Sequence, residues 1–297
     1  MSQQNSDLKA GYLYAILAFL IWGLAPIYFK ALGDTSALEI LAHRIAWSVP
    51  VIIIIMLAIK RPFPKSIWQD KKTLITLFIT ATLISSNWLI FTWAVVNDRV
   101  LDTSLGYFIN PLLTVALGIL VLREKLDGWK IAALILASLG VAYRIVILGG
   151  VPWISLSLAT TFAIYGLLRK QVNIGPLQGL LVETLIVLPV TAGYIFYLLW
   201  NGFGAFMQGN LTLDWLLIAG GVITTVPLAL FAAGARILPL NTIGFIQYLA
   251  PTLTFFLAVF AFNEPFNQDL LISFSFIWLG LVVYSFGNFK QSKRLTR

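Results

Sequence analysis

Two side chains able to do chemistry lie within Glu39–Pro50, which reads E-I-L-A-H-R-I-A-W-S-V-P. They are His43, the only histidine of the chain, and Arg44, in a run that is otherwise apolar as far as Ile59. A charged side chain in an apolar helix costs roughly 2.5–3.5 kcal/mol on insertion scales, so it usually faces a cavity or a partner. We therefore expect Arg44 to attract an anionic group of a solute, and we consider His43 as a proton carrier.

The composition and the motifs of the chain exclude several kinds of metal site and argue against two kinds of enzyme. The absence of cysteine excludes disulfides, thiolate metal sites and cysteine nucleophiles, and a single histidine excludes a multi-histidine metal centre. The chain contains neither G-x-S-x-G nor G-x-x-x-x-G-K-[ST], which argues against a serine hydrolase and an ATP-driven pump. We expect no catalytic residues, metal or cofactor.

The positions of the charges predict a membrane protein. Hydrophobic residues make up 59% and charged residues 11% of the chain, whereas soluble domains have about 45–50% and about 25%. The net charge of +8 does not indicate nucleic acid, because the charges lie at the ends of apolar segments. Residues 1–297 therefore form one domain whose partner is the lipid bilayer, and the first apolar run is expected to be a retained span.

Ten apolar segments are near the length that crosses a hydrocarbon core of about 30 Å. In lipid each must be helical, because unpaired backbone groups find no water there. The fold class is thus all-α integral membrane with ten transmembrane helices. The segments are 12–32, 37–59, 73–96, 103–122, 128–147, 151–170, 177–200, 212–235, 241–262 and 269–289.

The distribution of lysine and arginine predicts the orientation. With both termini cytoplasmic, 16 of the 20 basic residues lie in inner segments, including the basic tail 290–297. The inner residues are Lys9, Lys60, Arg61, Lys65, Lys71, Lys72, Arg123, Lys125, Lys130, Arg169, Lys170, Arg236, Lys290, Lys293, Arg294 and Arg297. Lys30 and Arg99 are outer, and Arg44 and Arg144 lie within spans.

The two halves of the chain, 11–147 and 151–289, resemble each other. Collinear matches include Pro111 with Pro251, Glu124 with Glu264, Leu139-Gly140 with Leu279-Gly280, and Pro50 with Pro189, which aligns Arg44 with Glu183. Five helices per half is an odd number, so the halves must have opposite topology. Inverted repeats around a midplane cavity are a common plan of transporters.

Four motifs resemble those of a known family: E-I-L-A-H-R-I-A-W-S, S-N-W-L-I-F-T-W-A-V, S-L-G-Y-F-I-N-P and Y-G-L-L-R-K. They resemble the RarD-type branch of the drug/metabolite transporter superfamily, which is built from two EamA-like repeats, and the resemblance covers essentially the whole chain. It implies ten helices, a bacterial inner (plasma) membrane location and transport of small metabolites or drugs. It supplies no motif for site residues, so these rest on position alone.

Arg44 lies about 10 Å from the outer end of its helix. One interpretation is an arginine that snorkels to the outer headgroups; the other is a cation that lines a cavity. Trp47 is expected on the face of Arg44, with His43 turned about 100° away. A lone histidine in a membrane is more often a structural hydrogen-bonding residue than a proton carrier.

Glu183 is expected to be the only acid well inside a span, near the inner end of the seventh helix. Inverted topology places it and Arg44 at mirror depths, about 10 Å apart along the membrane normal. Direct pairing would need Arg44 at full stretch. Proton coupling, or hydrogen bonding to a nearby backbone or hydroxyl group, is the preferred interpretation for Glu183.

The remaining candidates are polar and aromatic residues inside the spans, which fit a solute cavity but equally fit bonding between helices. The predicted substrate-binding set is Arg44, Trp22, Trp47, Asn87, Trp88, Tyr107, Asn110, Tyr165, Gln247 and Tyr248, and the predicted coupling or gating residues are Glu183 and His43. Pro26, Pro111, Pro227 and Pro251 are candidate gating kinks. Asp98, Arg99 and Asp102 are expected to form a solvated surface cluster.

These features favour a secondary transporter that moves a small organic solute (drug, amino-acid-like or aromatic metabolite) by alternating access, in the direction of export. An ion gradient, with proton coupling as one option, or the solute's own gradient would drive it. The alternatives are an intramembrane enzyme, a channel and a non-transporting scaffold. The sequence leaves the substrate and the oligomeric state open.

Overall fold

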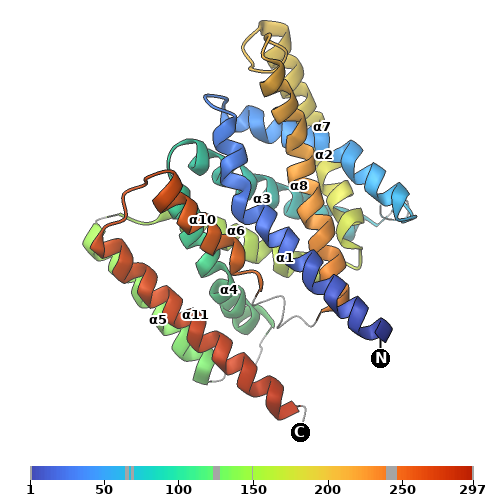
Figure 1. Ribbon diagram of the computed structural model, residues 1–297. Helices are drawn as coiled ribbons and strands as arrows, with labels where there is room; N and C mark the ends of the chain where they lie inside the picture. Colours follow the sequence, from blue (N-terminus) through green and yellow to red (C-terminus); the bar gives the residue numbers. More distant parts are fainter. Residues whose placement is uncertain are drawn as a thin grey trace.

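The computed structural model describes residues 2–63, 67, 70–122, 128–148, 150–238 and 246–295, and this part of the chain is helical throughout, with short connections (Figure 1). The helices are α1 (Ser2–Ala31), α2 (Ala37–Ala58), α3 (Lys71–Val96), α4 (Val100–Leu122), α5 (Gly128–Leu148), α6 (Trp153–Lys170), α7 (Pro176–Asn201), α8 (Leu211–Ile237), α10 (Leu249–Phe256), which continues as a π-helical turn, η2 (Leu257–Ala261), and α11 (Gln268–Leu295).

Seven of the described helices are long and apolar enough to cross a membrane, and α6 and the α10–η2 segment are shorter apolar helices. Each helix corresponds to one predicted span. Three limits differ by three residues or more: α1 begins at Ser2 instead of residue 12, α4 begins at Val100 instead of residue 103, and α11 ends at Leu295 instead of residue 289. The first part of the predicted span 241–262 lies outside the described residues.

Polar residues just before the helices explain where several of them begin. Ser36 accepts a hydrogen bond from the amide of Glu39 at the start of α2, and Asn210 accepts one from the amide of Leu213 at the start of α8. Asp70 does the same for α3, where the Thr73 hydroxyl and the amides of residues 73 and 72 lower the pKa of the Asp70 carboxyl. These caps satisfy amides that have no partner within the helix.

The predicted gating prolines do not separate the helices into pieces. Pro26 and Pro227 lie inside the continuous helices α1 and α8, and α4 runs through Pro111. Pro251 is in the first turn of α10, a position where a missing amide costs little.

Helices from the two halves of the chain lie side by side. α1 packs against α8 and α10, α6 packs against α3 and α4, α2 packs against α7, and α5 packs against α11. The α5–α11 pair forms one flank of the molecule (Figure 1). We call the end of the bundle where α2, α4, α6, α8 and α11 begin the α1–α2 end.

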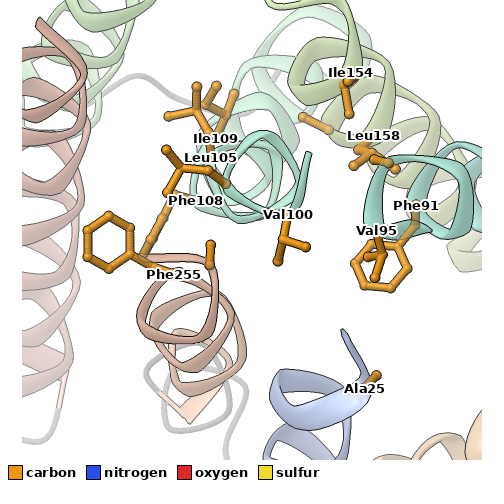
Figure 2. Close-up of a cluster of buried hydrophobic side chains, with 14 of the residues drawn as sticks. Ala25, Phe91, Val95, Val100, Leu105, Phe108, Ile109, Ile154, Leu158 and Phe255 are labelled. Carbon is orange, nitrogen blue, oxygen red and sulfur yellow. The ribbon is translucent and has the colours of Figure 1, made fainter. Parts of the chain in front are cut away.

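The largest buried cluster lies towards the α1–α2 end. It joins Ala25, Phe91, Leu105, Leu158 and Phe255 from α1, α3, α4, α6 and α10 (Figure 2). Two smaller clusters lie further from that end, one between α2 and α7 around Ile52 and Leu181 and one between α1 and α8 around Phe19 and Leu238. The described core is thus most extensive near one end of the bundle.

Candidate functional site

Arg44 is buried inside the protein, with 6% of its surface exposed. Its Nε donates to the hydroxyl of Thr224 on α8 at 3.0 Å, and its Nη1 donates to the hydroxyl of Thr92 on α3 at 2.9 Å. The snorkelling interpretation is therefore wrong: the guanidinium turns towards neighbouring helices.

Two aromatic rings also lie against the guanidinium of Arg44. The guanidinium carbon lies 4.9 Å from the ring centroid of Phe29 on α1 and 5.2 Å from that of Trp88 on α3. Within the described part of the chain, no carboxylate lies within ion-pair distance of this arginine. Hydroxyl oxygens and ring faces, rather than a counter-ion, therefore hold a buried positive charge.

Two glycines on α8 permit the approach of α2 to this site. A Cβ atom at Gly221 would lie 2.3 Å from the backbone carbonyl carbon of Trp47, and one at Gly220 would lie 3.0 Å from Cγ of Arg44. The Gly220-Gly221 pair is visible in the sequence, but nothing there indicates which helix it contacts. These glycines are positioning residues that sequence reasoning missed.

His43 and Trp47 bond to each other instead of flanking Arg44. The indole Nε1 of Trp47 donates to Nδ1 of His43 at 3.1 Å, and the imidazole lies 4.6 Å from the ring of Phe206. The expectation that Trp47 shares the site of Arg44 is therefore not met. Because Nδ1 accepts a hydrogen bond, it carries no proton, and a neutral imidazole is in place.

Glu183 is held in a separate buried cluster, with 1% of its surface exposed. Its carboxylate accepts from the hydroxyl of Thr80 at 2.6 Å and from the hydroxyl of Tyr165 at 3.3 Å, and Nε of Arg169 lies 3.5 Å from Oε1. The expectation of a hydroxyl partner is confirmed. The sequence placed Arg169 in an inner segment and did not predict this ion pair.

The space for Arg169 comes from Gly179, one turn before Glu183 on α7. A Cβ atom there would lie 2.1 Å from a guanidinium nitrogen of Arg169. Arg169 is the second functional candidate that sequence reasoning missed. The available signal was its spacing of four from Tyr165, which places both side chains on one face of α6.

Arg44 and Glu183 occupy equivalent positions, each the eighth residue of its helix, but they do not meet. Their hydroxyl partners on α3, Thr92 and Thr80, are separated by twelve residues, or about 18 Å along the helix. The two groups are therefore separate sites in this conformation.

The other predicted residues are distributed over several places. Asn87 donates to the carbonyl of Leu158 and the hydroxyl of Thr161, both at 2.9 Å, which joins α3 to α6. Trp22 packs edge-on against Phe19. Tyr107 and Asn110 on α4, and Gln247 and Tyr248 just before α10, are half-buried. Of the set, Trp88 and Tyr107 interact with Arg44, and Tyr165 bonds to Glu183.

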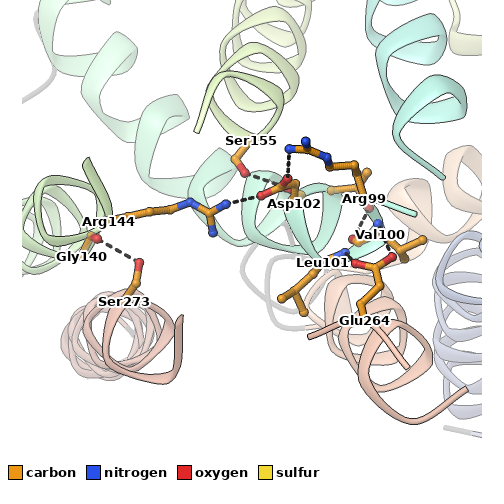
Figure 3. Close-up of polar contacts among 10 residues, drawn as sticks. Arg99, Val100, Leu101, Asp102, Gly140, Arg144, Ser155, Glu264 and Ser273 are labelled. Carbon is orange, nitrogen blue, oxygen red and sulfur yellow. Dashed lines mark hydrogen bonds and ion pairs between the residues drawn. The ribbon is translucent and has the colours of Figure 1, made fainter. Parts of the chain in front are cut away.

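The expected solvated cluster at Asp98, Arg99 and Asp102 is wrong for Asp102 (Figure 3). Asp98 is exposed and pairs with Lys30, whereas Asp102 is 9% exposed and its carboxylate bonds to Arg144 on α5. The reason is that α4 begins at Val100, so Asp102 lies in its first turn and faces neighbouring helices. Negative charge is favourable at a helix N-terminus.

Glu264 caps the same helix from the other half of the chain. Its carboxylate accepts hydrogen bonds from the amides of Val100 at 2.6 Å and Leu101 at 2.8 Å (Figure 3). Its predicted counterpart Glu124 lies outside the described residues. This cap, together with the hydrogen bond that the Ser155 hydroxyl donates to the carbonyl of Asp102, ties both halves together at the α1–α2 end.

The protein has many helices that can cross a membrane, and its buried charges are held in separate places. Its described residues contain no cluster of metal ligands. These features fit the transporter class. The comparisons agree. The EamA-like transporter family matches residues 9–145. Protein RarD of Escherichia coli (strain K12) is 41% identical over 277 residues, which cover 93% of this chain and 94% of that protein.

An uncharacterized transporter of Vibrio cholerae is 42% identical over 306 residues, which cover 100% of this chain and 99% of the relative. A solved crystal structure has a TM-score of 0.60 at 18% identity, covering 93% of this chain and 97% of that one, and so shows the fold alone. The chain belongs to the RarD-type branch of the drug/metabolite transporter superfamily. It is a multi-pass bacterial membrane protein of a transporter family.

Proposed function

We propose that the protein is a secondary transporter that exports a small organic solute with an anionic group by alternating access. The observation that carries the proposal is the buried Arg44, surrounded by ring faces and hydroxyls from both halves of the chain. A solute carboxylate would form charge-assisted hydrogen bonds with the guanidinium, and these are roughly twice as strong as neutral ones. An aromatic solute would also find Phe29 and Trp88 beside it.

The pairing of helices supports two inverted repeats, 11–147 and 151–289, as the moving parts. In these repeats α1, α2, α3, α4 and α5 correspond to α6, α7, α8, α10 and α11. The α1–α8 contact then corresponds to the α6–α3 contact, and the α1–α10 contact corresponds to the α6–α4 contact. The α2–α7 and α5–α11 contacts each correspond to themselves. All of these pairs are present. In this proposal ten helices cross the inner membrane, both termini are cytoplasmic, and the α1–α2 end faces outwards.

Glu183 is proposed as the coupling residue. Protonation of its carboxylate would remove the charge that holds Arg169 at 3.5 Å and would free the hydroxyls of Thr80 and Tyr165. Because these partners lie on α3 and α6, one proton would change contacts among three helices. A pH jump across proteoliposomes tests this: solute flux that is indifferent to the gradient would rule out proton coupling.

Counterflow in proteoliposomes with a panel of aromatic and amino-acid-like solutes, with and without a carboxylate, tests the proposed substrate class. We expect saturable flux of carboxylate-bearing solutes. Oriented vesicles would give the direction. A folded protein that moves no member of the panel would favour the scaffold alternative.

Arg44→Ala is expected to reduce this flux by roughly tenfold or more, because a hydrogen bond to a charged group contributes about 1.5–3 kcal/mol. Arg44→Lys keeps the charge but loses the planar fork, and we expect an intermediate flux. Arg99→Ala, which changes an arginine with a 56% exposed side chain, is the matched control. If Arg44→Ala and Glu183→Gln both transport as well as the wild type, the assignment of these sites is wrong.

A further inference from the structure

An apolar cavity of about 780 Å³ lies between α10 and α11, away from Arg44 and Glu183. Phe108 of α4 contributes to its lining, together with Phe255 and Phe256 on α10 and Trp278 and Val282 on α11. Neither transport of an anionic solute nor proton coupling uses this space. We call it the α10–α11 slot.

The slot has one closed end. The closed end points towards the α1–α2 end of the bundle. There the rings of Phe255 and Trp278 are in contact, with centroids 5.4 Å apart. Although α10 and α11 follow each other in the chain, their backbones hardly approach each other. Tyr248, just before α10, and Phe286 on α11 line the other part of the slot. The slot therefore runs along the helices, away from the α1–α2 end.

The slot is open at its side to the surface of the bundle. Phe256, Val282 and Phe286 line it and are 50%, 64% and 53% exposed. In a bilayer, an apolar surface at this position faces hydrocarbon chains. The hydroxyl of Thr252 donates to the carbonyl of Tyr248 on its own helix, so it does not make the slot polar.

A positive charge lies just beyond the far end of the slot. Lys290 is exposed and follows Phe286 by one helical turn, so both lie on the same face of α11. Its Nζ is 5.6 Å from the centroid of the Trp129 ring, and that ring contacts Phe286 at 5.2 Å. Basic residues next to the end of a membrane helix attract anionic lipid headgroups.

We propose that the α10–α11 slot binds one acyl chain of an anionic phospholipid, whose headgroup phosphate contacts Lys290. The apolar lining matches the chain, the lateral opening admits it from the bilayer, and the lysine lies where the headgroup would be. The occupant is thus a structural lipid that fills the gap between two helices.

Native mass spectrometry of the purified full chain, after exchange into phosphatidylglycerol or phosphatidylcholine, tests the proposal. We expect the wild type to retain one phosphatidylglycerol and at least tenfold less phosphatidylcholine. Val282→Trp fills the slot and should lose the lipid, whereas Leu279→Trp, at a 54% exposed residue of α11 that does not line the slot, should keep it. Lys290→Ala should lose the preference for phosphatidylglycerol, whereas Lys9→Ala should keep it.

A second measurement does not depend on the folding of the tryptophan variant. The chain has no cysteine, so Val282→Cys and Leu279→Cys can each be labelled with a small maleimide. Phosphatidylglycerol should slow the labelling of Val282→Cys several-fold and leave Leu279→Cys unchanged. Three outcomes would overturn the proposal. They are equal protection of both positions, equal retention of the two lipids by the wild type, and a dimer that Val282→Trp converts to a monomer.

Discussion

Arg44 and Glu183, the two charges that the sequence placed well inside spans, are each satisfied in a different way. Arg44 bonds to hydroxyls 48 and 180 residues away in sequence, whereas Glu183 accepts from a hydroxyl 103 residues away and also pairs with an arginine 14 residues before it. Patterning of the sequence predicted that both charges lie inside helices, because an apolar run identifies a span. It could not predict their partners, because the packing of helices decides which side chains meet.

For Asn87 the sequence left two hypotheses open, a place in a solute cavity or hydrogen bonding between helices, and the structure favours the second. Its side-chain amide donates to α6 at two points and is 1% exposed, which supports a role in joining helices. Asn87→Leu removes both hydrogen bonds and is expected to lower stability by about 1–2 kcal/mol, measured by thermal unfolding in detergent, with transport retained.

The matched control is Asn173→Leu, at an exposed residue between α6 and α7, which should leave the melting temperature unchanged. If Asn87→Leu instead retains full stability and loses solute flux, Asn87 belongs to the solute site.

At the scale of elements, the α5–α11 pair shows what a repeat in the sequence can predict. The match of Gly140 with Gly280 corresponds to a close contact of the two helices: a Cβ atom would lie 2.8 Å from the carbonyl of Ser273 in the first case and 2.9 Å from that of Ala133 in the second. The hydroxyl of Ser273 donates to the carbonyl of Gly140 at 2.9 Å. Sequence similarity indicated equivalence, and only the structure showed that each glycine contacts the partner helix.

Gly140→Ala and Gly280→Ala are therefore both expected to separate α5 from α11 and to lower the melting temperature. The expected cost is about 1–3 kcal/mol for overpacking. Gly193→Ala, in the middle of α7 with nothing within 4 Å, is the control, and it should be neutral or stabilising by up to about 1 kcal/mol. A melting temperature that falls equally in all three variants would contradict this role of the α5–α11 contact.

At the scale of the whole molecule, the number and approximate limits of the helices followed from hydropathy, because a bilayer fixes the length of a span. The position of the hydrophobic core could not be predicted from hydropathy. Its largest cluster closes the α1–α2 end, where hydrogen bonds from Val100 to Glu264 and from Ser155 to the carbonyl of Asp102 also connect the two halves. This distribution depends on contacts far apart in sequence, which hydropathy does not encode.

Alternating access predicts that this closed end opens during transport. Leu217→Cys, at a residue of α8 that is 1% exposed near the α1–α2 end, should be protected from a membrane-impermeant maleimide at rest. Addition of transported solute should increase its labelling several-fold. Asn97→Cys, at the exposed surface of the same end, should be labelled at the same rate throughout. Labelling of Leu217→Cys that is as fast as that of Asn97→Cys without solute would count against a closed end.

The short helix α6 has a consequence for the surrounding bilayer. Its 18 residues span about 27 Å, slightly less than a hydrocarbon core of about 30 Å, and Arg169 near its end turns inwards to Glu183. Hydrophobic mismatch of this kind is relieved when the adjacent leaflet thins. The protein should therefore sort to thinner membranes, and its activity in vesicles should fall as the lipid acyl chains are lengthened.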